Sequence, residues 1–196
     1  MKSSLSLITL LVIFALAGCE KETMVQENPD HINKLQITIP NGDFENWTPG
    51  YLLSDWQTNS CPLCLPAFET YIIRQDSMPY HGLYAAKFIY NNVYASWAKN
   101  KFPVPYHPAQ LSAYVKCNLV AGDTVMIKIK LLHNSQVTDS GQWFGLAPVN
   151  NYSPVIIPIS QNSALADSAF IYIRSGQKVN APGANTEFWV DDMKLQ

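Results

Sequence analysis

The chain has 196 residues, a net charge of −2, and only 14% charged residues. This balance excludes a strongly basic chain, and with it the broad positive field that many nucleic-acid-binding proteins carry. Aromatic residues make up 12% of the chain, and 13 prolines spread along it argue against long helices.

The first 18 residues read as an export signal. Lys2 supplies a positive charge, residues 5–17 are mostly apolar, and small residues precede Cys19. A charged start, a short apolar run and a small-residue cleavage site are typical of a secretory signal peptide. A membrane-spanning helix needs about 20 apolar residues, whereas Ser6 and Thr9 interrupt this shorter run. We therefore predict a signal peptide over residues 1–18.

The residues around the cleavage site indicate a lipid anchor. Leu16-Ala17-Gly18-Cys19 resembles the lipobox of bacterial lipoproteins, which implies that the Cys19 sulfur is acylated and that Cys19 is the mature N-terminus. Several acyl chains on one residue anchor a protein stably, whereas a single chain binds only marginally. Residues 19–34 are polar and lack apolar periodicity, so we predict a solvated tether.

The location follows from the same segment. An acidic run just after the lipidated cysteine resembles a surface-export signal of Bacteroidetes, and Lys21 interrupts that run here. We therefore predict an outer-membrane lipoprotein of the cell envelope. Its orientation, toward the cell surface or toward the periplasm, stays open at this point.

Residues 35–196 have the length of one domain with a real core. Apolar residues in this part recur mostly at every second position, which is the pattern of half-buried strands. Many short strands with turn residues between them and no convincing helix predict an all-β fold, namely a two-sheet antiparallel β-sandwich or jelly roll. The predicted strands are 36–39, 70–74, 84–90, 111–117, 124–132, 154–159, 168–174 and 187–195.

Connections matter as much as strands for function. Gly122-Asp123 separates the runs 111–117 and 124–132, so we expect a hairpin there. Loops of great length on a sandwich often carry binding residues. Four long connections are expected, at 52–69, 91–110, 133–153 and 175–186, and the first three contain aromatic residues.

Several short motifs, in the right order, resemble those of galactose-binding-like jelly rolls. Residues 39–47, Ile-Pro-Asn-Gly-Asp-Phe-Glu-Asn-Trp, resemble the opening strand of such carbohydrate-binding modules. Residues 81–88 resemble an inner strand, and 188–195, Phe-Trp-Val-Asp-Asp-Met-Lys-Leu, resemble the closing strand. Residues 112–123 resemble secreted Bacteroidetes domains called putative carbohydrate metabolism domains (PCMD). The resemblance implies a galactose-binding domain-like jelly roll that binds carbohydrate, although jelly rolls host many activities.

The same resemblance implies a calcium site. The family frequently holds a structural Ca²⁺ between its first and last strands, where this chain has Asp43, Glu45, Asp191 and Asp192. Calcium takes 6–8 oxygen ligands in flexible geometry. Strand alternation lets only one of the two neighbouring aspartates reach a common ion, and we predict Glu45 and Asp191 as ligands. A hydrogen-bonded cluster at the strand ends is the alternative.

The cysteines indicate an oxidising compartment. Cys61-Pro62-Leu63-Cys64 has the spacing of a redox motif, but that motif requires a strand-to-helix unit. In an exported all-β chain we predict a local Cys61–Cys64 disulfide. Zinc is a minor alternative, since it would need two further ligands. Cys117 lies on the apolar side of its strand, and we predict a buried, inert thiol.

Aromatic and amide residues in the long connections suggest a glycan site. An aromatic ring offers a flat apolar platform for a sugar, while amides bond its hydroxyl groups. Packing of these rings over the sandwich ends is the alternative. The predicted ligand-binding residues are Asn92, Tyr94, Trp97, Tyr106 and Trp143.

Recognisable catalytic motifs are missing from the sequence. Glu45 and Asp191 are the only tempting acid pair, but the Glu-x-Asp-x-x-Glu strand of jelly-roll glucanases and the Gly-x-Ser-x-Gly elbow do not occur. We therefore predict a lipid-anchored, non-catalytic protein that captures polysaccharide and does not bind nucleic acid. The alternatives are a structural lipoprotein that binds protein partners in an outer-membrane assembly, and a hydrolase or lyase with an unrecognised site.

Overall fold

The computed structural model describes residues 36–48, 52–61, 72–90, 95–163, 165–176 and 185–196. The regular elements in this part are strands. None of the described residues belongs to a helix long and apolar enough to cross a membrane. The predicted signal peptide, Cys19 and the tether 19–34 lie outside the described residues, and they stay predictions.

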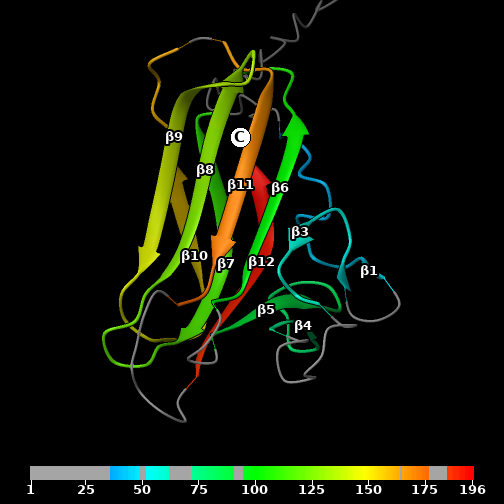
Figure 1. The fold of residues 1–196 in the computed structure, drawn as a ribbon, viewed down its shortest axis with the longest axis vertical. Helices are drawn as coiled ribbons and strands as arrows, with labels where there is room; N and C mark the ends of the chain where they lie inside the picture. The colour runs from blue at the N-terminus through cyan, green and yellow to red at the C-terminus, as the bar shows by residue number, and fades with distance from the viewer. Residues whose placement is uncertain (1–35, 49–51, 62–71, 91–94, 164, 177–184) are drawn as a thin grey trace, which may run out of the picture. The chain divides into compact units, whose positions relative to one another are not determined.

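Ten of the strands form two five-stranded antiparallel sheets, seen as two layers in Figure 1. We name each sheet after its central strand: the β12 sheet has the order β10-β7-β12-β5-β4, and the β11 sheet has the order β3-β6-β11-β8-β9. The predicted two-sheet jelly-roll sandwich is thus confirmed. The strands are β1 (Trp47–Thr48), β2 (Leu52–Leu53), β3 (Gln57–Thr58), β4 (Ile73–Asp76), β5 (Ala85–Tyr90), β6 (Trp97–Pro103), β7 (Gln110–Asn118), β8 (Val125–His133), β9 (Gln136–Gly145), β10 (Val149–Pro158), β11 (Ser168–Arg174) and β12 (Thr186–Leu195).

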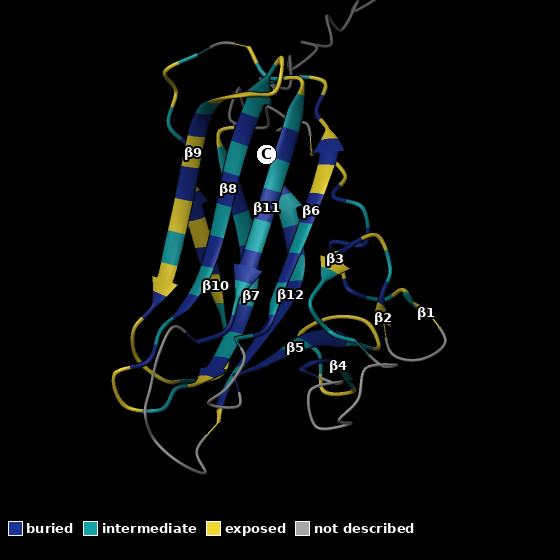
Figure 2. Ribbon diagram, viewed as in Figure 1, coloured by how far each residue is buried: buried dark blue, intermediate teal, exposed yellow. Residues whose placement is uncertain are grey.

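The core lies between the two sheets and follows from residue alternation. Successive side chains of a strand point to opposite faces. In β8 the apolar residues Val125, Ile127 and Ile129 are therefore fully buried, while the residues between them are half-buried. Figure 2 shows this banding along β8 and β11. Trp143 of β9 stacks on Phe188 of β12, with 6.1 Å between ring centroids, so aromatic contact joins the two layers.

The beginning and the end of the domain lie side by side, as the sequence predicts. Ile37 pairs with Leu195 in an isolated bridge, so the predicted strand 36–39 is reduced to a single pairing. The Met193 amide donates to the Gly42 carbonyl at 2.8 Å. A Cβ at Gly42 would approach the Ile39 Cβ to 2.9 Å, and only glycine allows this close contact.

The predicted hairpin of 111–117 with 124–132 is wrong. β7 pairs with β10 and β12, whereas β8 pairs with β9 and β11. Each strand has one apolar face, and the two faces meet the same core from opposite sheets. The turn at Gly122 (φ +83°) therefore carries the chain from one layer to the other.

Four strands lie in segments that the sequence predicts as connections, namely the two-residue β2 and β3 in 52–69 and the longer β6 and β9. β6 lies in 91–110 and β9 lies in 133–153. Their inward positions are not consistently apolar, because β6 buries Asn100, and β9 buries Asp139 and Gly141. A Cβ at Gly141 would collide with the Pro158 carbonyl oxygen of β10, so a side chain is excluded there. The alternation of apolar and polar residues that predicts a strand is therefore not visible in the sequence of β6 or β9.

Asp139 organises one end of the β11 sheet. Its fully buried carboxylate accepts hydrogen bonds from Asn162 N (2.7 Å), Ser160 Oγ (3.0 Å), His107 Nε2 (3.0 Å) and Ser163 N (3.2 Å). Burial by itself would raise the pKa of Asp139, but the four donors outweigh it and lower the pKa to about 2. The carboxylate thus fixes the loop 160–163 against the strand.

Replacing Phe188 tests the inter-sheet contact. We expect Phe188→Ala to lower the free energy of unfolding by about 3–5 kcal/mol, because a fully buried ring is lost and a cavity remains. Urea denaturation measures the change. Ile156→Ala is the control, since that side chain is 60% exposed and its loss should change stability by less than about 0.5 kcal/mol. Equal effects of the two substitutions would contradict this account of the core.

The pH dependence of stability tests the Asp139 cluster. We expect Asp139→Asn to cost about 2 kcal/mol at neutral pH, because a donor amide replaces one acceptor oxygen. The folded pKa lies below the ordinary value of 3.8, so the ionised carboxylate contributes fully above pH 3.8 and its contribution is lost as the pH falls toward 2. Urea denaturation across this range should therefore show the two proteins converging. The exposed Asp43→Asn is the control, and a pH-independent difference would refute the assignment.

Candidate functional site: the outer face of the β11 sheet

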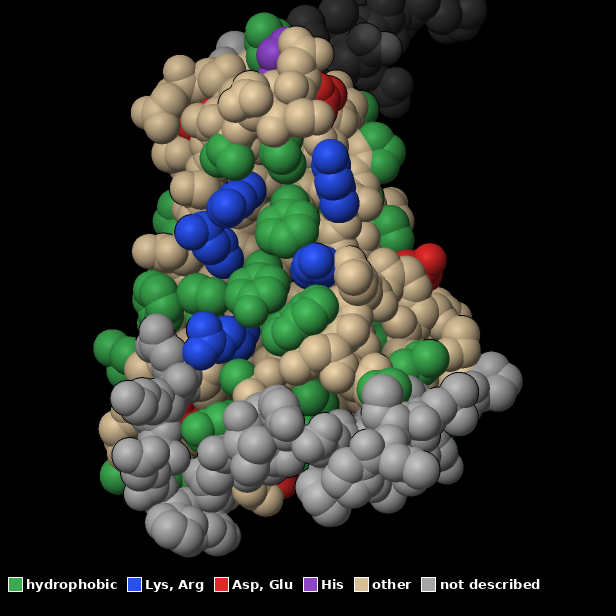
Figure 3. All heavy atoms as spheres, viewed as in Figure 1, with side chains coloured by type: hydrophobic (Ala, Val, Ile, Leu, Met, Phe, Trp, Pro, Cys, Tyr) green, Lys and Arg blue, Asp and Glu red, His purple; other side chains and the backbone are tan. Residues whose placement is uncertain are grey.

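The side of the β11 sheet that faces away from the core carries aromatic, cationic and amide side chains. Alternating burial along the strands defines these positions, and Figure 3 shows hydrophobic side chains at the centre of the face with Lys and Arg around them. We call this set the outer β11 face. Its residues are Gln57, Trp97, Lys99, Lys101, Met126, Lys128, Lys130, Gln142, Phe144, Phe170, Tyr172 and Arg174.

Strand register places these side chains in rows across the sheet. Tyr172 of β11 lies opposite Lys99 of β6 on one side and Lys128 of β8 on the other. Phe170 lies in the same way between Lys101 and Lys130. Neighbouring strands are about 4.8 Å apart, so each aromatic ring of β11 has a lysine on both sides. The ends of the Tyr172 row are the amides Gln57 and Gln142.

Trp97 and Tyr172 form the aromatic centre of the face. Their ring centroids lie 6.4 Å apart with an interplanar angle of 30°. The Lys99 ammonium is 5.2 Å from the Trp97 ring centroid, a cation–π contact. Burial raises the pKa of Tyr172, while the charge of Arg174 lowers it less strongly. The Tyr172 phenol therefore keeps its proton at neutral pH and can both donate and accept a hydrogen bond.

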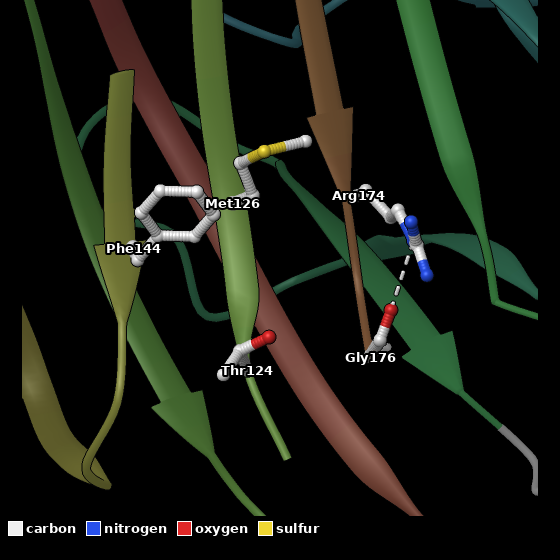
Figure 4. A pocket seen from close by; sticks show the side chains of 5 residues that line it. All are labelled: Thr124, Met126, Phe144, Arg174 and Gly176. Carbon is white, nitrogen blue, oxygen red and sulfur yellow. Dashed lines mark hydrogen bonds between the residues drawn. The ribbon is translucent and has the colours of Figure 1, made fainter. Parts of the chain in front are cut away.

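A small hollow lies at one end of the face, between β8, β9 and β11. It has a volume of about 150 Å³ and is lined by Thr124, Met126, Phe144, Arg174 and Gly176 (Figure 4). Arg174 Nε donates to the Gly176 carbonyl at 3.0 Å, which holds the guanidinium beside the hollow. Pockets that enclose a small ligand measure about 300–1,000 Å³. The hollow therefore suits one substituent of a larger ligand lying on the open face.

The outer side of the β12 sheet is partly covered by residues of the protein itself. Tyr80 stacks on Tyr114 with 3.4 Å between ring centroids. The Lys116 and Lys87 ammonium groups lie 4.2 and 4.6 Å from the ring centroid of Trp189, which is 8% exposed. The Trp189 ring on this side is therefore covered by lysines, whereas Tyr80 is 45% exposed and stacks on Tyr114 through one face.

Glu45 and Asp191, which the sequence predicts as calcium ligands, accept hydrogen bonds from the backbone of a loop. Glu45 Oε1 accepts two backbone amides of loop 80–84 at 2.8 and 3.1 Å, and Asp191 Oδ2 accepts two more at 2.8 and 3.0 Å. Asp191 Oδ1 accepts the Asp192 amide at 2.7 Å. Burial raises the pKa of Asp191, although these amides oppose the shift. N–H groups thus point at both carboxylates where a cation would need oxygen ligands.

This arrangement does not fit the predicted Ca²⁺ between Glu45 and Asp191, and it corresponds to the hydrogen-bonded alternative. In the part of the chain that the structure describes, no three His, Cys, Asp or Glu residues are grouped to hold a metal. The glycine in the loop fits the same arrangement, because Gly82 has φ +77° and a Cβ there would collide with the Glu45 carboxylate.

A larger polar groove lies beside this loop. Its volume is about 480 Å³, and its lining includes Thr38, Asn41, His81 and Asp192. Among the described residues, no Phe, Tyr or Trp ring lines it, and Asp192 is already paired with Lys194 at 2.8 Å. The groove therefore lacks the stacking surface that the outer β11 face has.

The predicted ligand-binding residues separate into three groups. Trp97 lies on the outer β11 face. Trp143 and Tyr106 are partly buried rings packed against the core, and Trp143 points inward because it lies opposite the buried Ile127; for these two the alternative of packing is correct. Tyr94 and Asn92 lie outside the described residues.

Two cysteines can be placed. Cys61 is disulfide-bonded, while Cys64 lies outside the described residues, so the Cys61–Cys64 pairing stays a prediction. Cys117 is a buried free thiol, as predicted, and burial raises its pKa. A raised pKa leaves a small thiolate fraction, so we expect this thiol to react slowly.

Sequence reasoning missed most of the outer β11 face. Alternation in 168–174 does place Phe170, Tyr172 and Arg174 on one side, but a strand pattern alone does not indicate which strands are neighbours. The inference that the chain has no basic field is wrong for this face. Net charge cannot show it, because the sheet gathers five cations that the sequence scatters, namely Lys99, Lys101, Lys128, Lys130 and Arg174.

Comparison with known proteins finds the fold among solved structures only. No protein family and no curated protein match the sequence, so the resemblance to the PCMD of Bacteroidetes stays a prediction. The structure is similar to that of TmCBM61 in complex with β-1,4-galactotriose, with a TM-score of 0.55, 12% identity, and coverage of 81% of this chain and 96% of that chain.

Two similar structures are parts of longer proteins. One is an arabinose-bound GH51 α-L-arabinofuranosidase, with a TM-score of 0.52, 13% identity, and coverage of 83% of this chain and 26% of that chain. The other is the enzymatically active domain of bacteriophage CBA120 tailspike protein 4, with a TM-score of 0.50, 15% identity, and coverage of 81% of this chain and 21% of that chain. At such identities the likeness establishes the fold alone.

Thermal unfolding tests the role of the two carboxylates. Because N–H donors point at Glu45 and Asp191, we expect the same Tm in CaCl₂ and in EDTA. We also expect Asp191→Ala to lower the free energy of unfolding by about 1–3 kcal/mol, since the amides of Tyr80 and His81 lose their acceptor. A calcium-induced rise in Tm that Asp191→Asn abolishes would restore the calcium site. The exposed Asp43→Asn serves as control.

Proposed function

We propose that this protein is a lipid-anchored envelope protein that binds carbohydrate, without cutting it, on the outer β11 face. The observation that carries the proposal is the aromatic centre formed by Trp97 and Tyr172 on an open sheet, with amide side chains at the row ends. Sugar rings stack on aromatic faces through their C–H side, and amides bond their hydroxyl groups.

The fold supports the proposal, since it is shared with a module solved in complex with a galactotriose. The anchor rests on the sequence of residues 1–19 and its resemblance to lipoprotein signals. A tether of residues 19–34 would let the domain stand clear of the membrane. The proposed location is the outer membrane, with the binding face presented to polysaccharide.

Non-catalytic binding is part of the proposal. The one acid pair that the sequence suggests, Glu45 and Asp191, is engaged by backbone amides of loop 80–84 on the other sheet. The aromatic centre lies on the β11 sheet. No described carboxylate lies at an outward position of β6, β8, β9 or β11, the strands around that centre. Paired carboxylates are what most glycoside hydrolases use.

Substitution of the two central rings tests the site. We expect Trp97→Ala and Tyr172→Ala each to weaken binding to a glycan, identified on a glycan array, about tenfold, which corresponds to about 1.4 kcal/mol. Isothermal titration calorimetry with the purified chain measures the Kd. Tyr80→Ala is the matched control, because it removes a loop ring that stacks on Tyr114 of the other sheet.

Three results would count against the proposal. Unchanged affinity in both ring variants would remove the outer β11 face as the site. An array on which the chain binds no glycan, together with specific capture of an envelope protein, would favour the structural alternative. Release of reducing sugar from the bound polysaccharide would make the protein an enzyme.

A further inference from the structure

The charge of the outer β11 face differs from that of the whole chain. The chain has a net charge of −2, yet this face carries four lysines and one arginine. All outward positions of β6, β8, β9 and β11 lack Asp and Glu. In Figure 3 acidic side chains are visible only toward the margins of the view. The face is therefore a local positive field in a mildly acidic protein.

Two lysines of the β12 sheet form ion pairs, whereas the lysines of the outer β11 face have no described carboxylate at ion-pair distance, and only the charge of Lys101 acts on a more distant acid, Asp167. On the β12 sheet, Lys87 and Lys194 form ion pairs with Glu187 and Asp192. On the outer β11 face, no described carboxylate lies within 4.0 Å of the ammonium of Lys99, Lys101, Lys128 or Lys130. Like charges held together on one surface repel one another. An anionic ligand would relieve that repulsion.

We infer that the outer β11 face takes an acidic polysaccharide, one whose sugars carry carboxylate or sulfate groups. This inference rests on the proposed glycan-binding function and names the class of glycan. The rows place a ring between two ammonium groups, Tyr172 between Lys99 and Lys128, and Phe170 between Lys101 and Lys130. A sugar stacked on the ring would present a charged substituent at its edge to either lysine.

The contact at Trp97 favours an acidic sugar over a neutral one. The Lys99 ammonium already lies at the Trp97 ring, 5.2 Å from its centroid. A neutral sugar that stacks there displaces the cation and offers it only uncharged hydroxyl oxygens. A uronate or sulfated sugar stacks and offers the displaced ammonium an anion, so the cation–π contact is exchanged for an ion pair. Arg174, held beside the hollow, is placed to bind a further carboxylate or sulfate.

Nucleic acid is the competing polyanion, because bases also stack on aromatic rings. The outer β11 face gathers only five cations, and the net charge of the chain is negative. The row-end amides Gln57 and Gln142 add hydrogen-bonding groups that suit hydroxyl-rich ligands. These observations favour the glycan, and the experiment below includes single-stranded DNA.

The experiment compares polysaccharides that share a backbone and differ in charge. Polygalacturonate is paired with its fully methyl-esterified form, and dextran sulfate with dextran, and an oligo(dT) strand of similar length is added. Affinity is measured with the purified full chain by isothermal titration calorimetry at several salt concentrations. We expect at least one acidic polymer to bind tenfold or more tightly than its neutral counterpart, and its affinity to fall as salt rises.

Charge variants locate the effect. Lys99→Gln combined with Lys128→Gln removes the two cations beside Tyr172, and Lys116→Gln combined with Lys194→Gln makes the same charge change on the β12 sheet. We expect the first pair to lose tenfold or more in affinity for the acidic polymer and to show a weaker salt dependence. The second pair should bind like the original chain, and circular dichroism checks that both fold.

Each outcome has a defined meaning. Binding of only one acidic polymer supports the inference and tells carboxylate from sulfate. Equal binding of acidic and neutral forms, or equal loss in both double variants, overturns the inference and leaves glycan binding intact. Failure of every polysaccharide on the panel and on a glycan array overturns both the inference and the proposed function. Oligo(dT) binding as tight as that of the acidic polymer also overturns the inference, because the face would then recognise nucleic acid.

Discussion

The burial of one face of the β11 sheet is the constraint on which the rest of this protein depends. Val125, Ile127 and Ile129 of β8 are fully buried, as are their neighbours on β11. Because strand side chains alternate between faces, the burial of these residues makes the residues between them point outward. A slip of one residue would bury the lysines and expose the aliphatic side chains. The core thus fixes the register, and the register arranges the outer face.

The same constraint explains why rings and cations alternate there. Each outward row joins residues from strands that are far apart in the chain, such as Lys99, Lys128 and Tyr172. Their spacing comes from backbone hydrogen bonds between strands, not from side-chain contacts. Strand pairing thus fixes the backbone positions of these residues before a ligand arrives, so no backbone ordering has to accompany binding.

The two outer faces of the sandwich have different roles. On the β12 sheet, the carboxylates of Glu45 and Asp191 accept amides of loop 80–84, and Tyr80 covers Tyr114. Buried polar groups that are fully hydrogen-bonded stabilise a closed surface. On the β11 sheet no described loop residue stacks on Tyr172 in this way, and Trp97 is its aromatic neighbour. Acidic residues thus hold a loop on the β12 side, whereas the outward positions of β6, β8, β9 and β11 carry rings and cations and no described acidic residue.

The sequence by itself determined the class of fold and the pairing of the first and last segments, and it named Trp97 as a candidate, while the leader and the tether stay predictions. These depend on local patterns: period-two alternation, an apolar run before a cysteine, and short motifs in order. Tertiary structure decided the rest. It placed β7 and β8 in different sheets, and it packed the Trp143 ring against the core. It also formed β6 and β9, whose inward polar or glycine residues, such as Asn100 and Gly141, hide the strand pattern in the sequence. It also gathered five scattered cations on one face, because only strand pairing determines which residues become neighbours.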